Sequence, residues 1–469
     1  MNISDLKLLI YYQSMKKMKE GNKSLSETIR KETIECVESL TTHGLPNLSR
    51  TKYTFIKIMW LVLTISSAGV SVYFITETLS EYAEYSVTTE VRLINSEESL
   101  EFPTISICNK NRFSTNYSID LVNDLIKSKY NRSFEDYFHS TYSDLKLSLL
   151  VKSFLQDNDI KYIFSNIEIN EREKFTLSLK DSLINCRFMD QNCSHLDFEW
   201  FFNSKYGNCY KFNANGLKNS TNVYKDNGLI IELFLNHPKE LDILDYEKGL
   251  FVSIDSKNLD TYFDLQNLLE ISTGLQTSIK IQKSLFKRYP KPYSNCDFRD
   301  GSIDSLTSEQ KELYNEIINA NLSYSNSFCK IFCRQKLIYQ KFSCKLRANS
   351  LTVPNIKYCN TSKDYLSYSE REDKYRQSAT DSCIKTCPIE CETIKYDTDI
   401  FITKYPEIYL KHFHHLPNKK EKTIDNFLVL KIFYGSLNFM SYKESPSMTV
   451  FELISNLGGT LGLFLGKYR

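Results

Sequence analysis

An uncharged run near the N-terminus constrains the fold of this chain more than any other feature. Residues 58–75 read IMWLVLTISSAGVSVYFI, and none of them carries a charge. About twenty apolar residues in a helix cross a hydrocarbon core of ~30 Å, so the run predicts a membrane helix over residues 55–75. A secretory signal peptide lies within about the first thirty residues of a chain. We therefore expect a retained membrane anchor, and not a signal peptide or the buried helix of a soluble protein.

The charges on either side of this run predict its orientation. Arg50, Lys52 and Lys57 precede it, and Glu77, Glu81, Glu84, Glu90 and Arg92 follow it. Cytoplasmic flanks of membrane helices are enriched in Lys and Arg. We therefore expect residues 1–54 in the cytoplasm and residues 76–447 outside the cell.

The thirteen cysteines divide in a way that agrees with this topology. Cys36 stands alone on the cytoplasmic side, and the other twelve lie between Cys108 and Cys391. An even set confined to one region predicts six disulfides in an oxidising compartment. Zinc binding favours Cys-x2-Cys spacing, whereas three residues separate Cys383 from Cys387 and Cys387 from Cys391. The spacing therefore indicates disulfides and no metal site.

Six Asn-x-Ser/Thr sequons in the outer segment are candidates for N-glycosylation. They are Asn116, Asn131, Asn192, Asn219, Asn321 and Asn360. Such sequons also arise by chance in a chain rich in Asn and Ser, so they support an extracellular location only weakly.

Charge and motif content exclude several classes of protein. The chain has 59 Lys and Arg against 57 Asp and Glu, so we expect no nucleic-acid partner. His412, His414 and His415 lie close together, but no cysteine or acidic ligand spacing accompanies them, and we interpret them as part of a solvated loop. No phosphate-binding loop, HExxH pair or nucleophile elbow is present, so we expect neither an enzyme nor a cofactor.

The outer segment mixes the patterns of strands and helices. Apolar alternation and β-branched residues predict strands at 104–108, 228–235, 249–254, 277–281 and 427–434. Thr307 and Gln310 form a capping-box pattern that predicts a helix through Asn319, and residues 136–154 and 363–377 are further helical candidates. We therefore predict one large α+β domain braced by disulfides.

The last apolar run is shorter and has a different pattern. Residues 451–466 read FELISNLGGTLGLFLG, with no charge after Glu452. On a helix, Ser455, Gly459, Gly462 and Gly466 fall at steps of four, three and four, which places four small residues on one face. Such a strip lets helices approach closely or lines a narrow passage. At ~1.5 Å per residue the run covers about two thirds of a ~30 Å core, so alone it does not span a membrane.

Seven short motifs occur in a set order around the membrane run. They are His43-Gly44, FPTISICN (102–109), YGNCYKFN (206–213), Pro292-Tyr293 before Cys296, Tyr324-Ser325 with Cys329 and Cys333, CPIEC (387–391) with Tyr396, and GGTLGLFLG (458–466). Together they resemble the degenerin/epithelial sodium channel family, which includes the acid-sensing and peptide-gated channels. The resemblance covers roughly residues 40–466.

The resemblance implies a fold and a set of disulfides. A large extracellular domain, with a β-sheet palm and β-ball and a helical finger and thumb, would lie between two transmembrane helices. The segments would be cytoplasmic 1–54, a first membrane helix 55–75, extracellular 76–447, and the outer part of a second membrane helix 448–469. The implied pairs are Cys108–Cys209, Cys186–Cys193, Cys296–Cys391, Cys329–Cys387, Cys333–Cys383 and Cys344–Cys359. Spacing alone allows many other pairings.

The resemblance also implies a function. Family members are trimers in the plasma membrane that pass sodium ions and are blocked by amiloride. The chain is thus expected to be one subunit of a homo- or heterotrimeric, sodium-selective cation channel in the bilayer, gated from the extracellular side. A peptide, another ligand or force would be the stimulus. Proton gating is not indicated, because no histidine lies between Phe74 and Cys108, where acid-sensing relatives carry a pair.

The candidate site residues follow from the same resemblance. The pore and selectivity positions are Ser455, Gly459, Gly462 and Gly466. Ser455 also matches a gating position where a bulky replacement holds the channel open. His43 and Gly44 match a cytoplasmic gating element, where glycine permits a turn before the helix.

The chain departs from the family pattern after Gly466. Lys467, Tyr468 and Arg469 follow, where the family has a small residue and then serine. A lysine beside a cation filter would repel sodium, so we expect a truncated second membrane helix that lacks its inner half. Two alternatives stay open, a non-conducting truncated subunit and a single-pass, disulfide-rich receptor or adhesion ectodomain.

Overall fold

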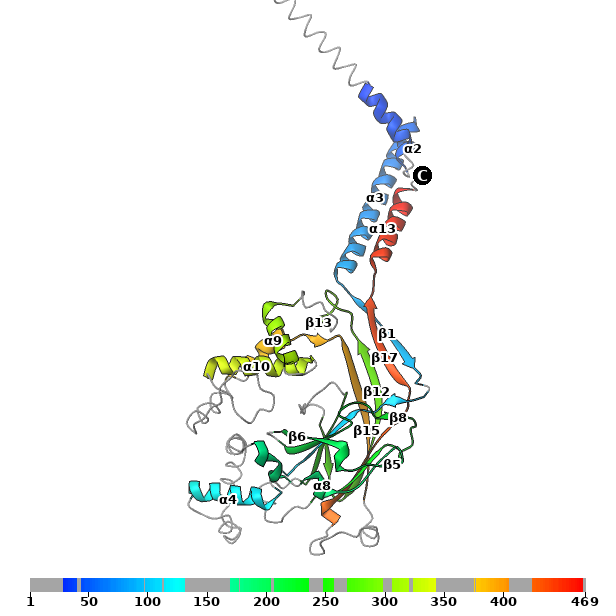
Figure 1. The fold of residues 1–469 in the computed structure, drawn as a ribbon. Helices are drawn as coiled ribbons and strands as arrows, with labels where there is room; N and C mark the ends of the chain where they lie inside the picture. The colour runs from blue at the N-terminus through cyan, green and yellow to red at the C-terminus, as the bar shows by residue number, and fades with distance from the viewer. Residues whose placement is uncertain are drawn as a thin grey trace, which may run out of the picture. The chain divides into compact units, whose positions relative to one another are not determined.

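The chain divides into two compact units, Met1–Thr88 with Ser445–Arg469, and Thr89–Glu444 (Figure 1). We call the first the helix-pair unit and the second the sheet unit. The computed structural model describes residues 28–39, 44–96, 98–111, 114–130, 169–176, 178–203, 206–235, 248–256, 268–297, 306–319, 324–342, 375, 377–404 and 424–466.

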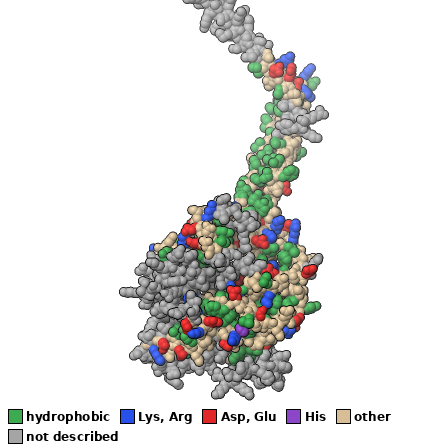
Figure 2. Space-filling view, viewed as in Figure 1, with side chains coloured by type: hydrophobic (Ala, Val, Ile, Leu, Met, Phe, Trp, Pro, Cys, Tyr) green, Lys and Arg blue, Asp and Glu red, His purple; other side chains and the backbone are tan. Residues whose placement is uncertain are grey.

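Helix α3 (Thr54–Ala83) is the longest element of the helix-pair unit. It contains the predicted membrane run and continues past residue 75, where the sequence analysis ended it. Within the described ranges it is the one helix long and apolar enough to cross a membrane. Hydrophobic side chains gather over the visible surface of this unit, as is typical of helices that face lipid (Figure 2). The short helix α2 (Leu45–Arg50) precedes α3.

Helix α13 (Val450–Leu465) begins with a capping box. The Thr449 amide donates to Glu452 Oε2 at 2.7 Å, and the Glu452 amide donates to Thr449 Oγ1 at 3.2 Å. This reciprocal pair satisfies two backbone N–H groups at the start of the helix. As described, α13 is shorter than a membrane-crossing helix. The expectation of a truncated second membrane helix stays a prediction.

The larger sheet has eight strands. They run in the order β1-β17-β12-β16-β9-β4-β5, and β15 pairs with β12. Their bounds are β1 Val87–Ile94, β4 Leu183–Phe188, β5 Gln191–Asn192, β9 Leu229–Phe234, β12 Leu275–Lys287, β15 Glu392–Lys404, β16 Phe427–Tyr434 and β17 Phe439–Pro446. β12 and β15 are antiparallel over their full lengths. Ile279, Ile281, Leu430 and Ile432 are fully buried and form the centre of the core.

A second, five-stranded sheet carries two of the sequence motifs. Its order is β11-β10-β3-β7-β6. The bounds are β3 Thr104–Asn109, β6 Phe198–Asn203, β7 Gly207–Phe212, β10 Gly249–Asp255 and β11 Leu269–Ser272. β3 and β7, from the FPTISICN and YGNCYKFN motifs, are antiparallel neighbours with Cys108 opposite Cys209. Ile105, Ile107 and Phe212 join the same core as the larger sheet.

Helices α9 (Ser308–Asn319) and α10 (Asn326–Phe342), with the helical residues 377–386, form a small bundle in the sheet unit. The predicted capping box of α9 is present: the Thr307 amide donates to Gln310 Oε1 at 3.1 Å, and the Gln310 amide donates to Thr307 Oγ1 at 3.3 Å. The remaining elements are α4 Asn116–Tyr130, α8 Leu179–Ser182, the paired strands β2 Leu100–Glu101 and β8 Asn219–Ser220, the paired strands β13 Cys296–Asp297 and β14 Ile389–Glu390, and 3-10 turns at Ile169–Phe175, His195–Asp197 and Ile424–Asn426.

The α+β prediction is confirmed. All five predicted strands are present, as β3, β9, β10, β12 and β16, and so is the helix that ends at Asn319. The helical candidate at 136–154 lies outside the described residues, as does nearly all of 363–377. Strand β15 was not predicted, because it is exposed along most of its length and so lacks a clear apolar alternation.

Candidate functional site

Helix α13 has two opposite faces with different surroundings. The partly buried face, which packs on α3, consists of Leu453, Leu457, Thr460 and Phe464. Ser455, Gly459 and Gly462 are exposed. The two rows are offset by two residues, which at ~100° per residue places them on opposite sides of the helix. A Cβ atom added at Gly459 or Gly462 would meet no atom within 4 Å. The small strip therefore faces away from α3.

Gly466 does not continue this strip, which corrects the sequence analysis. α13 ends at Leu465, and Gly466 follows with φ 106° and ψ 165°. A φ of this size lies where glycine is strongly favoured. Gly466 is also buried, whereas Gly459 and Gly462 are exposed. The small face of the helix thus has three residues, and a break in the helical backbone follows it.

Helix α3 contacts the other face of α13 through the Ser67 hydroxyl and the Phe74 ring. Ser67 Oγ donates to the carbonyl oxygen of Phe464 at 2.7 Å. The rings of Phe74 and Phe464 stack, with centroids 5.8 Å apart. Ser71, one helical turn from Ser67, is 1% exposed. The sequence analysis missed these serines, although their spacing of four within an apolar run was a usable signal.

Gly44 is held where any side chain would be strained. Its φ is +94°, and a Cβ atom at this position would collide with Thr64 Oγ1 of α3. The Gly44 carbonyl accepts a hydrogen bond from the Leu48 amide at 3.0 Å, which closes the first turn of α2. Because Gly44 has no side chain, the start of α2 can lie close to Thr64 of α3. His43, the other residue of this candidate gating element, lies outside the described residues.

The FPTISICN and YGNCYKFN motifs have a structural role. Asn213, the last residue of the second motif, has φ 57°. Its Nδ2 donates to the Phe102 carbonyl oxygen at 2.5 Å, and its Oδ1 accepts from the Lys218 amide at 2.9 Å. The disulfide Cys108–Cys209 joins the two strands. These residues fix the fold around the second sheet, and none of them belongs to the pore positions.

Among the described residues, five disulfides are present, all in the sheet unit. They are Cys108–Cys209, Cys186–Cys193, Cys296–Cys391, Cys329–Cys387 and Cys333–Cys383. These coincide with five of the six pairs that the family resemblance implies. Cys344 and Cys359, the sixth pair, lie outside the described residues.

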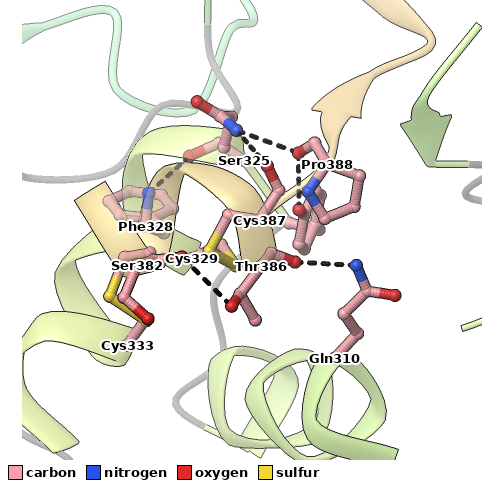
Figure 3. Close-up of a disulfide and its surroundings, with 12 residues drawn as sticks. Gln310, Ser325, Phe328, Cys329, Cys333, Ser382, Thr386, Cys387 and Pro388 are labelled. Atoms are coloured by element: carbon pink, nitrogen blue, oxygen red, sulfur yellow. Dashed lines mark hydrogen bonds between the residues drawn. A yellow bond between two sulfur atoms is a disulfide. The ribbon is translucent and has the colours of Figure 1, made fainter. Parts of the chain in front are cut away.

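The bundle is tied at one end by disulfides and hydrogen bonds (Figure 3). Cys329–Cys387 and Cys333–Cys383 join α10 to residues 377–387. Asn326 Nδ2 donates to the Cys387 carbonyl oxygen at 2.9 Å, and Gln310 Nε2 donates to the Thr386 carbonyl oxygen at 2.7 Å. Helices α9 and α10 are thereby both fixed to residues 377–387.

Two buried tyrosines lie in the core of the sheet unit. Tyr434 donates its hydroxyl to the Glu101 carbonyl oxygen at 2.6 Å, and Tyr396 hydrogen-bonds to Tyr434. Burial raises the pKa of both hydroxyls well above the usual value, because a phenolate would lose its hydration. Both therefore stay protonated as structural donors.

The remaining candidate sites carry little chemistry. Among the sequons, Asn116, Asn192 and Asn219 are exposed. Asn131, Asn321 and Asn360 lie outside the described residues, as do His412, His414 and His415. No group of three or more His, Cys, Asp or Glu side chains in the described ranges could hold a metal ion.

Comparisons with known proteins agree with these features. A sequence model of the amiloride-sensitive sodium channel family matches residues 36–467. Acid-sensing ion channel 2 of Rattus norvegicus is 26% identical over 432 residues, which cover 88% of this chain and 79% of that protein. The bile acid-sensitive ion channel of Rattus norvegicus is 26% identical over 443 residues, covering 91% and 83%. Acid-sensing ion channel 1C of Danio rerio is 24% identical over 473 residues, covering 96% and 84%.

Among solved structures, a proton-activated chloride channel aligns with 87% of this chain and 91% of its own at 9% identity, but its TM-score of 0.32 is too low to support an argument. The family match, in contrast, includes α3, the disulfide-bonded sheets and α13. The related proteins are ion channels, which confirms that the chain is not an enzyme. This chain therefore belongs to the amiloride-sensitive sodium channel family, whose members are gated cation channels of the plasma membrane.

Proposed function

We propose that this protein is a subunit of an amiloride-sensitive, sodium-selective channel that opens in response to an extracellular stimulus. The observation that carries the proposal is the free small strip of α13. Ser455, Gly459 and Gly462 face away from α3, and space is open beside both glycines. Helices can converge on a narrow conduit only where the facing side chains are small. The strip thus has the chemistry of a pore-lining face.

The assembly that we propose is a trimer of this chain or of this chain with related subunits. A cyclic arrangement places the same helix face of every subunit around one axis. In the trimer, the strips of three α13 helices line the path of sodium, and α3 supports each α13 from the lipid side. Gly466, at the break after α13, lies next to the strip and is the candidate for the narrowest point.

The topology that we propose has residues 1–54 in the cytoplasm, α3 across the plasma membrane and the sheet unit outside the cell. Two observations support it. The five disulfides all lie in the sheet unit, where an oxidising environment would form them. Cys36, the free cysteine among the described residues, precedes α3 in the sequence.

The stimulus is proposed to be an extracellular ligand, such as a peptide, or force. The related proteins are named for sensitivity to acid and to bile acids, so both belong in the test panel. The absence of a histidine between Phe74 and Cys108 argues against the proton route of the acid-sensing relatives.

Voltage-clamp recording of cells that express the full chain, alone and with related subunits, tests the proposal. We expect an amiloride-blocked inward current that reverses near the sodium equilibrium potential when one stimulus of the panel is applied. Surface biotinylation controls for delivery. A protein that reaches the surface with related subunits and passes no cation current under any stimulus would contradict the proposal.

A further inference from the structure

Among the described residues, one side-chain hydrogen bond joins α3 and α13, near the end of α13. Ser67 Oγ, on α3, donates to the Phe464 carbonyl oxygen at 2.7 Å, although 397 residues separate the two positions in sequence. The Phe74 and Phe464 rings stack beside it at 5.8 Å, with an interplanar angle of 19°. Phe464 is therefore held from both its backbone and its side chain.

The carbonyl that accepts this bond lies in the last turn of α13. The last four carbonyl groups of a helix have no partner within the helix, and Phe464 is the residue before the last one of α13. In a hydrocarbon environment an unsatisfied carbonyl is costly, so a hydroxyl from a neighbouring helix stabilises the place where the helix stops. Gly466, with its non-helical backbone, follows two residues later.

Ser71 shows that a buried hydroxyl at this interface does not make such a bond by default. It lies one turn from Ser67 on the same face of α3 and is 1% exposed. Yet among the described residues its Oγ has no hydrogen-bond partner. Ser67 and Ser71 therefore share residue type and helix face, although Ser71 is the more deeply buried, and only Ser67 bonds to α13.

We propose that Ser67 is a positioning residue for ion conduction. Its hydroxyl anchors the end of α13 to α3, so that the small strip stays turned away from α3 and Gly466 keeps its place at the break. The anchor works through the Phe464 carbonyl and does not touch the ion. This inference rests on the proposed channel function and adds to it a residue on α3 that governs selectivity.

The first experiment measures the ratio of sodium to potassium permeability, from reversal potentials, in cells that express the full chain. Interhelical hydrogen bonds in membranes contribute roughly threefold to tenfold to an equilibrium, so we expect Ser67→Ala to lower the ratio by about threefold or more. Ser67→Thr keeps a hydroxyl and should therefore show the permeability ratio of the unmodified chain. Ser71→Ala removes a hydroxyl that bonds to nothing, so its ratio should equal that of the unmodified chain. A current from Ser67→Ala with the unmodified ratio would overturn the proposal while leaving the channel function intact.

The second experiment does not depend on current, so a silent channel would still test the anchor. Spin labels are attached at Leu63→Cys and Leu463→Cys, whose parent side chains are 51% and 72% exposed, in the full chain with Cys36→Ser to remove the free thiol. Electron-spin measurements in lipid nanodiscs give the distribution of distances between the two labels. This distribution should become wider when Ser67→Ala is added and stay unchanged when Ser71→Ala is added. An equal distribution in all three proteins would overturn the proposal, whatever the current measurements give.

Discussion

Two groups of helices in this protein are held together by different means. In the bundle of the sheet unit, two disulfides join α10 to residues 377–387, and side chains of Asn326 and Gln310 bond to the same segment. In the helix-pair unit, α13 packs on α3 through a partly buried face, to which the described residues add one hydrogen bond from Ser67 and one stacked ring pair. The bundle is braced covalently, whereas the helix pair is held by weak contacts.

The difference agrees with the part that each group would play in a gated channel. A lever that transmits a stimulus has to keep its shape, and disulfides restrict the alternatives open to a chain. A pore helix has to move between states that differ by a few kcal/mol, so its contacts have to be individually weak. Four substitutions test whether the two groups of helices differ in this way.

The largest effect is expected from Ser455→Phe. Ser455 is exposed on the face away from α3. In the proposed trimer, the new ring would point toward neighbouring subunits at the pore. We expect a constitutive, amiloride-blocked current about tenfold or more above the unmodified level, as a population shift toward the open state. Ile454→Phe, on an adjacent and also exposed position, is the matched control and should leave the current unchanged. Equal currents from both variants would show that Ser455 does not lie on the pore face.

The second change opens the braced bundle. Replacing Cys333 and Cys383 together by serine should lower the local stability of the bundle by about 2–5 kcal/mol. Hydrogen exchange of α10 amides would measure this loss. If the bundle transmits the stimulus, the stimulated current should fall while the constitutive current of Ser455→Phe persists. Unchanged exchange in α10 would mean that the hydrogen bonds suffice and that the contrast between the two groups is smaller than proposed.

The third change compares two glycines of the helix-pair unit. Gly44→Ala places a side chain at φ +94° and against Thr64, so it should destabilise the unit by ~1–3 kcal/mol. Gly459→Ala meets open space and should leave thermal unfolding of the detergent-solubilised protein unchanged. Adding Thr64→Ala to Gly44→Ala removes the collision but not the backbone strain, and should recover part of the loss. Equal unfolding temperatures for both glycine variants would contradict the packing of α2 on α3.

The smallest effect concerns a charge inside the bundle. Burial raises the pKa of the Glu316 carboxyl on α9, Lys336 on α10 opposes this, and Glu312 adds to it. A raised folded pKa stabilises the fold below the unfolded pKa, and that contribution is lost as pH rises through the folded value. Glu316→Gln should therefore raise the unfolding temperature slightly at pH 7, with the gain shrinking toward pH 4.

Glu312→Gln is the control for this pH effect. Glu312 Oε1 lies 2.6 Å from Lys336 Nζ, so losing that charge removes an ion pair and should give no gain at pH 7. A stability loss in Glu316→Gln at pH 7 would show that the Glu316 charge is satisfied by a partner.

Residue patterns alone predicted a membrane helix, the α+β class and the grouping of the small residues. A run of eighteen uncharged, mostly apolar residues is typical of a membrane helix. The periodicity of apolar residues that predicts strands and helices is a local property of the sequence. The spacing of Ser455, Gly459 and Gly462 likewise fixed that they share one side of a helix. The disulfide pairs were different, because spacing left many pairings open and only the family resemblance selected one.

Which neighbour covers which helix face became visible in the three-dimensional packing alone. Periodicity tells which residues share a side of α13, but not that α3 takes the side of Leu457 and leaves that of Gly459 free. The contacts of Gly44 with Thr64 and of Ser67 with Phe464 join segments far apart in sequence, so no local pattern records them. The break at Gly466 needs a φ of 106°, which the backbone adopts after α13 and which the small-residue spacing could not reveal. Shared faces are set by the sequence of one helix, whereas the partner of each face depends on the packing of the whole chain.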